Sequence, residues 1–164
     1  MLMKTFYSSY ILLEQNQLDE AGAIQNAFYY QVHHSPELQC DIAEEVDSGK
    51  TSWVIYYDKS VDAQLLKYHQ LHYGDIRFSC FINVEPFVKK LCNYHLSTLT
   101  GYLILVFDQA HRQIISQELD ASELLIEYRQ FFYDNSGKDE KEKIFYPSSW
   151  IIMKKKLNHQ NSTI

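Results

Sequence analysis

The feature that most limits the possible folds is the shortness of every apolar run in the sequence. The longest uninterrupted run, from Tyr102 to Phe107, has only six residues. A membrane-spanning helix needs about 20 apolar residues, whereas a run of six matches one buried β-strand. The sequence therefore predicts a buried strand here and no membrane-spanning helix. Residues 1–13 lack a small-residue cleavage site, so we expect them to belong to the mature protein and not to a signal peptide.

The composition is typical of a compact globular chain. The 164 residues are 46% hydrophobic and 22% charged, with five Gly and three Pro. We expect one domain over residues 1–153 and a polar, frayed tail over residues 154–164. Cys40, Cys80 and Cys92 are odd in number and form no Cys-x-x-Cys motif. They indicate buried thiols in a reducing cytoplasm and not a disulfide framework.

Hydrophobic periodicity predicts helices that alternate with strands. Apolar residues three or four apart predict helices over residues 17–33, 36–47, 61–73 and 86–96, and a further helix from Asp120 to Asn135-Ser136-Gly137. Aromatic and β-branched runs predict strands over residues 52–57, 76–84, 102–107 and 113–117, and an extended segment over residues 144–153. Residues 2–13 fit either a helix or a strand.

The order of these elements predicts the fold class. Two successive strand–helix–strand crossovers predict parallel pairing, and the short connection after Phe107 predicts an antiparallel hairpin. We therefore expect an α/β (or α+β) fold, with a mixed, partly parallel β-sheet flanked by helices in a single compact domain.

Sequence motifs for common chemistry are missing. Gly49-Lys50-Thr51 resembles the end of a phosphate-binding loop, but Glu44 stands where that loop needs glycine, and the residues that follow predict a strand and not a helix. No GxSxG, SxxK or GxGxxG pattern occurs. We expect no cofactor. With three Arg beside 12 Lys, the chain is poor in the side chain that best reads phosphate and guanine, so we expect no nucleic-acid partner.

Three acidic residues follow predicted strands, namely Asp58, Glu85 and Asp108. Ligands of open α/β sheets bind at this edge, and converging carboxylates hold divalent metal ions. One hypothesis is therefore a divalent-metal-dependent phosphoryl-transfer or nuclease-type enzyme. The ordinary alternative is that these acids cap the helices that follow the strands.

A weaker metal hypothesis concerns two pairs of residues on predicted helices. His69 and His72 are three apart, as are Cys92 and His95. Residues three apart lie on one side of a helix, so the two pairs together would supply four zinc ligands. A hydrogen-bonded histidine at the edge of the core is the ordinary alternative.

Acidic side chains predict a binding surface on the early part of the chain. Residues 1–50 carry eight acidic and two basic side chains, whereas residues 138–164 carry three and six. One face of the predicted helix 36–47 carries Glu37, Asp41, Glu44 and Glu45, with Asp19 and Glu20 expected nearby. Such a patch attracts a basic partner, and exposed tyrosines would add contact area. An ordinary solvated helix face is the alternative.

These properties favour a function in binding another protein. Small size, net negative charge and the lack of motifs are the general design of immunity proteins that neutralise basic toxins. We therefore expect a non-catalytic, cytoplasmic protein-binding protein of the immunity or inhibitor type. The metal-dependent enzyme is the alternative.

Overall fold

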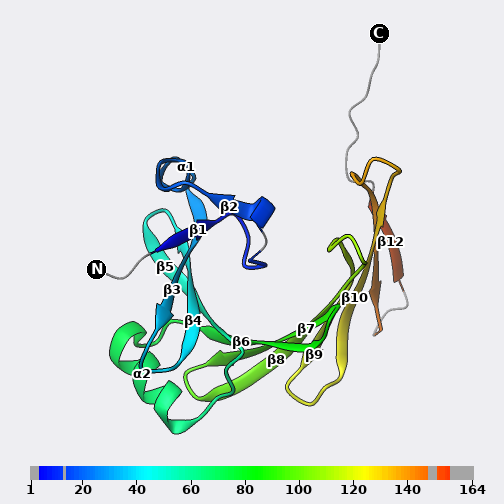
Figure 1. Cartoon of the computed structure of the whole chain (residues 1–164). Helices are drawn as coiled ribbons and strands as arrows, with labels where there is room; N and C mark the ends of the chain where they lie inside the picture. The colour runs from blue at the N-terminus through cyan, green and yellow to red at the C-terminus, as the bar shows by residue number, and fades with distance from the viewer. Residues whose placement is uncertain (1–3, 13, 148–150, 156–164) are drawn as a thin grey trace. The chain divides into compact units, whose positions relative to one another are not determined.

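The computed structural model describes residues 4–12, 14–147 and 151–155, and most of these residues lie in strands (Figure 1). The strands are β1 (Thr5–Tyr7), β2 (Gln17–Leu18), β3 (Phe28–Ser35), β4 (Cys40–Asp47), β5 (Lys50–Tyr57), β6 (Phe78–Glu85), β7 (Val88–His95), β8 (Thr98–Phe107), β9 (Gln113–Asp120), β10 (Leu125–Tyr133), β11 (Asp139–Tyr146) and β12 (Ile151–Lys155). The described helices are the 3₁₀ turn η1 (Glu14–Asn16), α1 (Glu20–Gln25) and α2 (Ala63–Tyr73). None of them is long and apolar enough to cross a membrane.

The chain forms two compact units, and the expected domain over residues 1–153 contains parts of both. The first unit comprises residues 1–82 and 91–100, and the second comprises residues 83–90 and 101–164. The expected polar tail, 154–164, begins with the last two residues of β12, and residues 156–164 lie outside the described part.

The expected fold class is wrong, because the described residues form a mixed sheet with only short helices. The predicted helix 17–33 contains α1 but continues as strand β3, and the predicted helix 36–47 is a turn followed by β4. The predicted helices 86–96 and 120–134 are replaced by β7 and β10. For the predicted helix 36–47, the physical reason is that a spacing of four residues keeps side chains on one side of a helix and also on one face of a strand. Leu38, Ile42 and Val46 therefore fit both structures.

One of the two predicted crossovers is confirmed. In the first unit, strands are hydrogen-bonded in the order β7-β6-β5-β4-β3-β1-β2. Strand β5 pairs with β6 in parallel, and α2 connects these two strands (Figure 1). The pairings of β1 with β2, β1 with β3, β3 with β4, and β4 with β5 are antiparallel. Residues 2–13, which fit either structure, contribute strand β1 from Thr5 to Tyr7.

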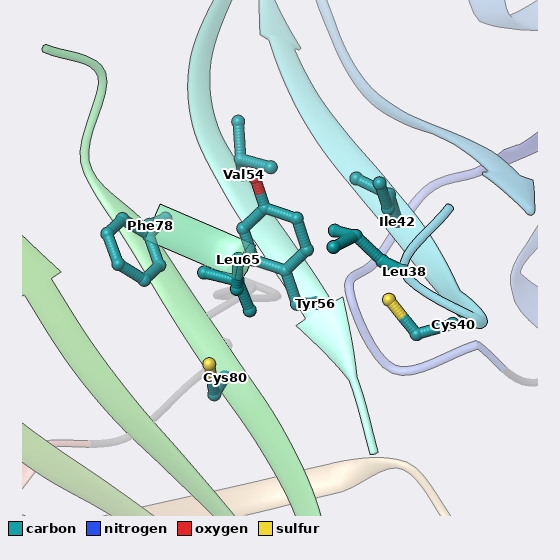
Figure 2. Packing of buried hydrophobic residues seen from close by; sticks show 8 residues of the cluster. All are labelled: Leu38, Cys40, Ile42, Val54, Tyr56, Leu65, Phe78 and Cys80. Carbon is teal, nitrogen blue, oxygen red and sulfur yellow. The ribbon is translucent and has the colours of Figure 1, made fainter. Parts of the chain in front are cut away.

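Helix α2 closes the core of the first unit. It begins after Asp62, whose carboxylate accepts a hydrogen bond from the Leu65 amide at 2.8 Å. The Leu65 side chain is fully buried against strands β4, β5 and β6 (Figure 2). The core cluster consists of Leu38, Cys40, Ile42, Val54, Tyr56, Leu65, Phe78 and Cys80. Cys40 and Ile42 of β4, and Val54 and Tyr56 of β5, therefore point toward the helix.

The second unit is built from consecutive antiparallel strands. Strand β8 pairs with β9, β9 with β10, β10 with β11, and β11 with β12. The predicted hairpin between residues 102–107 and 113–117 is thus confirmed.

Three turns of this unit share one local structure. Asp108, Asp120 and Asp134 each accept hydrogen bonds from the backbone amides two and four residues later. The third residue after each Asp has a positive φ, between 59° and 83°. An aspartate that satisfies amides in this way can begin a tight turn as well as a helix, and this explains why Asp120 was expected to cap a helix.

The burial of Leu65 leads to a stability prediction. Leu65→Ala should lower the free energy of unfolding by about 2–5 kcal/mol, because it leaves a cavity between α2 and the sheet. Leu71→Ala on the same helix is the control, since Leu71 is 77% exposed. It should change the free energy by about 0.5 kcal/mol or less. Urea unfolding followed by circular dichroism measures both, and equal losses would contradict the described packing.

Candidate functional site

The candidate site is an open pocket of about 530 Å³ in the first unit, which we call the Glu44 pocket. It lies among strands β3, β4 and β5, the end of α2 and Lys4. Its lining residues are Lys4, His33, Glu44, Thr51, Tyr68, His72, Tyr73 and Ile76. Pockets of this size are typical of small-ligand or side-chain recognition.

Strand register explains why these side chains meet. Gln31 pairs with Glu44, and His33 pairs with Ile42, across the antiparallel β3–β4 hairpin. Directly opposed residues share a face, so all four point to the side on which Ile42 contacts the α2 core. Tyr73 is the last residue of α2 and reaches Glu44 from that side.

Glu44 is the centre of a hydrogen-bond network. Its Oε2 accepts hydrogen bonds from Gln31 Nε2 at 2.8 Å and from Thr51 Oγ1 at 3.2 Å. Its Oε1 accepts one from the Tyr73 hydroxyl at 3.1 Å. Lys4 Nζ reaches the network indirectly, since it donates to Gln31 Oε1 at 3.2 Å. The carboxylate is therefore held in place mainly by neutral donors.

His33 lies beside this carboxylate with a free ring nitrogen. Its Nδ1 is buried, makes no hydrogen bond, and is 3.7 Å from Glu44 Oε1. The His33 side chain is 10% exposed. Burial lowers the pKa of His33, although the nearby Glu44 partly opposes this effect. Burial, with a further contribution from Glu44, raises the pKa of Tyr73. Both rings are therefore neutral near pH 7, beside a carboxylate.

The six acids of the expected binding surface do not form one patch, because the helix that was to carry four of them is a turn and a strand. Glu44 and Glu45 are neighbours on β4 and point to opposite faces. Glu44 lies in the pocket. Glu45 is buried and accepts hydrogen bonds from the Tyr30 hydroxyl at 2.7 Å and Ser52 Oγ at 2.6 Å.

The remaining four acids lie at different ends of the β3–β4 hairpin. Asp41 is exposed near the turn that joins these strands and bonds to His34 at 2.9 Å, and Glu37 is exposed in that turn. Asp19 accepts a hydrogen bond from the Gly22 amide and caps α1, which begins with the exposed Glu20. Helix α1 leads into the far end of β3, about 20 Å from Asp41 at about 3.3 Å per residue.

The strand-end acids of the enzyme hypothesis lie in separate local structures. Asp58 belongs to the first unit and has a positive φ of 50°. Glu85 is the last residue of β6, in the second unit. Asp108 holds its own turn and is paired with Arg112 at 2.7 Å. In the described part of the chain, no three His, Cys, Asp or Glu side chains gather closely enough to hold a metal ion.

Of the four residues of the weaker zinc hypothesis, His69 and His72 lie on helix α2 as expected, whereas Cys92 and His95 do not lie on a helix. His69 is buried, and its two ring nitrogens lie 2.8 Å from the Tyr56 hydroxyl and 2.7 Å from the Ile76 carbonyl oxygen. Both nitrogens are therefore occupied within the core. His72 packs on the Tyr68 ring at the pocket. Cys92 and His95 lie on strand β7, where residues three apart face opposite sides.

Comparisons with protein-family models, curated proteins and solved structures give no match for this chain. The site is therefore interpreted from its own geometry. Of its lining residues, the sequence singled out only Glu44 as a binding residue and His72 as a possible metal ligand. His33 and Tyr73 lie beside Glu44, and Tyr68 lines the same pocket, only through register and the crossover, and no local motif marks them.

The buried histidines predict a pH-dependent stability. Burial lowers the pKa of His33 and of His69 from the ordinary value of 6.5. The unfolded chain therefore binds more protons than the folded chain below about pH 6.5, so the free energy of unfolding should fall as the pH falls through that range. Above it, these histidines should add no pH dependence.

Substitution separates the contribution of the pocket histidine. His33→Gln should make the loss of stability between pH 7.5 and 5.5 smaller, whereas the exposed control His111→Gln should leave it unchanged. Urea unfolding at a series of pH values measures this difference. Identical slopes for wild type and His33→Gln would show that His33 is not buried in its neutral form.

Proposed function

We propose that the protein is a non-catalytic protein-binding protein that captures a basic protein through its first unit. The segregation of charge between the two units carries this proposal. The first unit contains eleven acidic and five basic side chains, so its net charge of −6 equals that of the whole chain. The second unit contains ten of each and has no net charge.

Such a field acts at long range and needs no single patch. Like-signed charge on one part of a protein raises the rate at which an oppositely charged partner arrives, by about 10-fold or more. The exposed members of the predicted surface are Asp19, Glu20, Glu37 and Asp41. We assign them to this attraction, whereas Glu44 lies in a pocket and Glu45 supports the sheet from within.

An immunity or inhibitor protein that neutralises a basic toxin has this general design, and we propose that role. We also propose that the protein works in the cytoplasm. Cys40 and Cys80 are free, buried thiols, and burial raises their pKa values to about 11 and about 12. Such thiols are unreactive and suit a reducing compartment.

Charge reversal tests the proposal. The variant with Glu37→Lys and Asp41→Lys should bind the partner with an association rate on the order of 10-fold lower, because both side chains are exposed on the acidic unit. Added salt should also lower the association rate of the wild type, because it screens the attraction. The partner is first captured from cells of the source organism and identified by mass spectrometry, and the rate is then measured with both purified proteins.

The matched control makes the same change of charge on the neutral unit. Glu85→Lys with Glu118→Lys replaces two exposed acids there and should leave the rate nearly unchanged. Equal slowing by both double variants would show that only total charge matters. Retention of an acidic partner, or of none, would contradict the proposed function.

A further inference from the structure

We infer that the Glu44 pocket holds an arginine side chain of the basic partner. This inference rests on the proposed function and names the contact that would make the capture specific. It begins from one unused acceptor position on Glu44 Oε1, beside the unbonded Nδ1 of His33.

The Glu44 carboxylate in the pocket has room for one more hydrogen-bond donor. A carboxylate has about four acceptor positions, and Glu44 uses three of them, two on Oε2 and one on Oε1. The remaining position is on Oε1, which lies 3.7 Å from the unbonded Nδ1 of His33. Because Nδ1 itself is buried, a ligand nitrogen meets the site at Oε1, and the unbonded Nδ1 adds to the negative potential there. In its neutral form, the His33 ring accepts at Nδ1 when its proton is on Nε2.

A ligand that donates here must bring hydrogen atoms and gains from bringing positive charge. A guanidinium group supplies five N–H donors and stays charged at every physiological pH. Its bond to Glu44 is charge-assisted and about twice as strong as a neutral hydrogen bond. The net charge of −6 on the surrounding unit favours the same ligand.

The walls of the pocket favour a flat cation. Tyr68 and Tyr73 line it, and the His72 ring lies 4.2 Å from the Tyr68 ring. Guanidinium groups stack on aromatic faces, and two arginines of this chain do so already. Arg77 lies 5.3 Å from the Trp53 ring centre, and Arg112 lies 4.9 Å from that of Tyr133.

One lining residue, Lys4, weakens the binding of a cation, and this effect gives a test of the charge of the ligand. Lys4 contributes a positive charge at the pocket, where it bonds to Gln31. Its removal should therefore tighten the binding of an arginine side chain but weaken the binding of any anionic ligand. The direction of this effect identifies the sign of the ligand's charge.

The experiment uses the full chain and blocked arginine, N-acetyl-arginine N-methylamide, followed by NMR. The ring signals of His33 and Tyr73 should shift along a saturable curve with a dissociation constant in the millimolar range. Blocked citrulline has nearly the same shape without the charge and should bind about 10-fold more weakly. Blocked lysine, which lacks the planar group, should also bind more weakly.

Variants test the named contacts. Glu44→Gln should weaken arginine binding about 10-fold, Lys4→Gln should tighten it severalfold, and Glu118→Gln in the second unit should leave it unchanged. If Glu44→Gln does not fold, the Lys4→Gln result still decides the charge of the ligand. Thr51→Val removes one donor to Glu44 and frees a further acceptor position, so it should not weaken binding.

The outcomes separate this inference from the proposed function. A wild-type protein whose His33 and Tyr73 signals do not respond to blocked arginine overturns the arginine pocket, even if a basic partner is captured. Equal binding of citrulline or of lysine overturns it as well. In a further outcome, blocked arginine binds saturably while no basic partner responds to charge reversal at Glu37 and Asp41. That result would support the arginine pocket and overturn the proposed function.

Discussion

The parallel pairing of β5 with β6, connected by α2, is the constraint on which the first unit depends. A parallel pair cannot be closed by a tight turn, so the connecting helix must cross the sheet and bury its apolar side there. Leu65 fills this interface together with Tyr56 and Phe78. His69 adds a polar link, because its ring joins the Tyr56 hydroxyl to the carbonyl group of Ile76. The same crossover brings Tyr73 to Glu44, so the core and the pocket share one cause.

Glu44 and Glu45 are neighbours in sequence, but strand geometry gives them different surroundings. Glu45 points away from α2 and is satisfied by hydroxyl donors, with Arg77 at 3.6 Å. Glu44 points toward α2, and its Oε1 keeps an acceptor position next to His33. A helix would have set both on one polar face, whereas a strand sends them to opposite sides. The change from helix to strand therefore removes the expected acidic patch and creates a pocket with a carboxylate.

The sequence predicted helix α2 and the hairpin of β8 with β9 correctly. Helix α2 carries apolar residues at mixed spacings of three and four, and the hairpin of β8 with β9 follows a continuous apolar run. The expected helix 36–47 relied on spacings of four, which strands share. The expected helix 17–33 and the one after Asp120 also had mixed spacings, and there the pairing of β3 and β10 with neighbouring strands decided the structure. For the site, Glu44 could be named from its charge. His33 and Tyr73 could not, since only the β3–β4 register and the crossover place them beside it.

The proposed attraction and the proposed pocket act at different ranges, and each supplies what the other lacks. A net charge spread over one unit speeds the arrival of any basic protein, but it distinguishes poorly among them and weakens in salt. A pocket with an unused acceptor position distinguishes by shape and donor position, but only after contact. Lys4 belongs to this balance, because its positive charge weakens the binding of every cation, so that only a group that also forms several hydrogen bonds is retained. In this proposal, the specificity of the first unit arises at Glu44, and the speed of association arises from the charge around it.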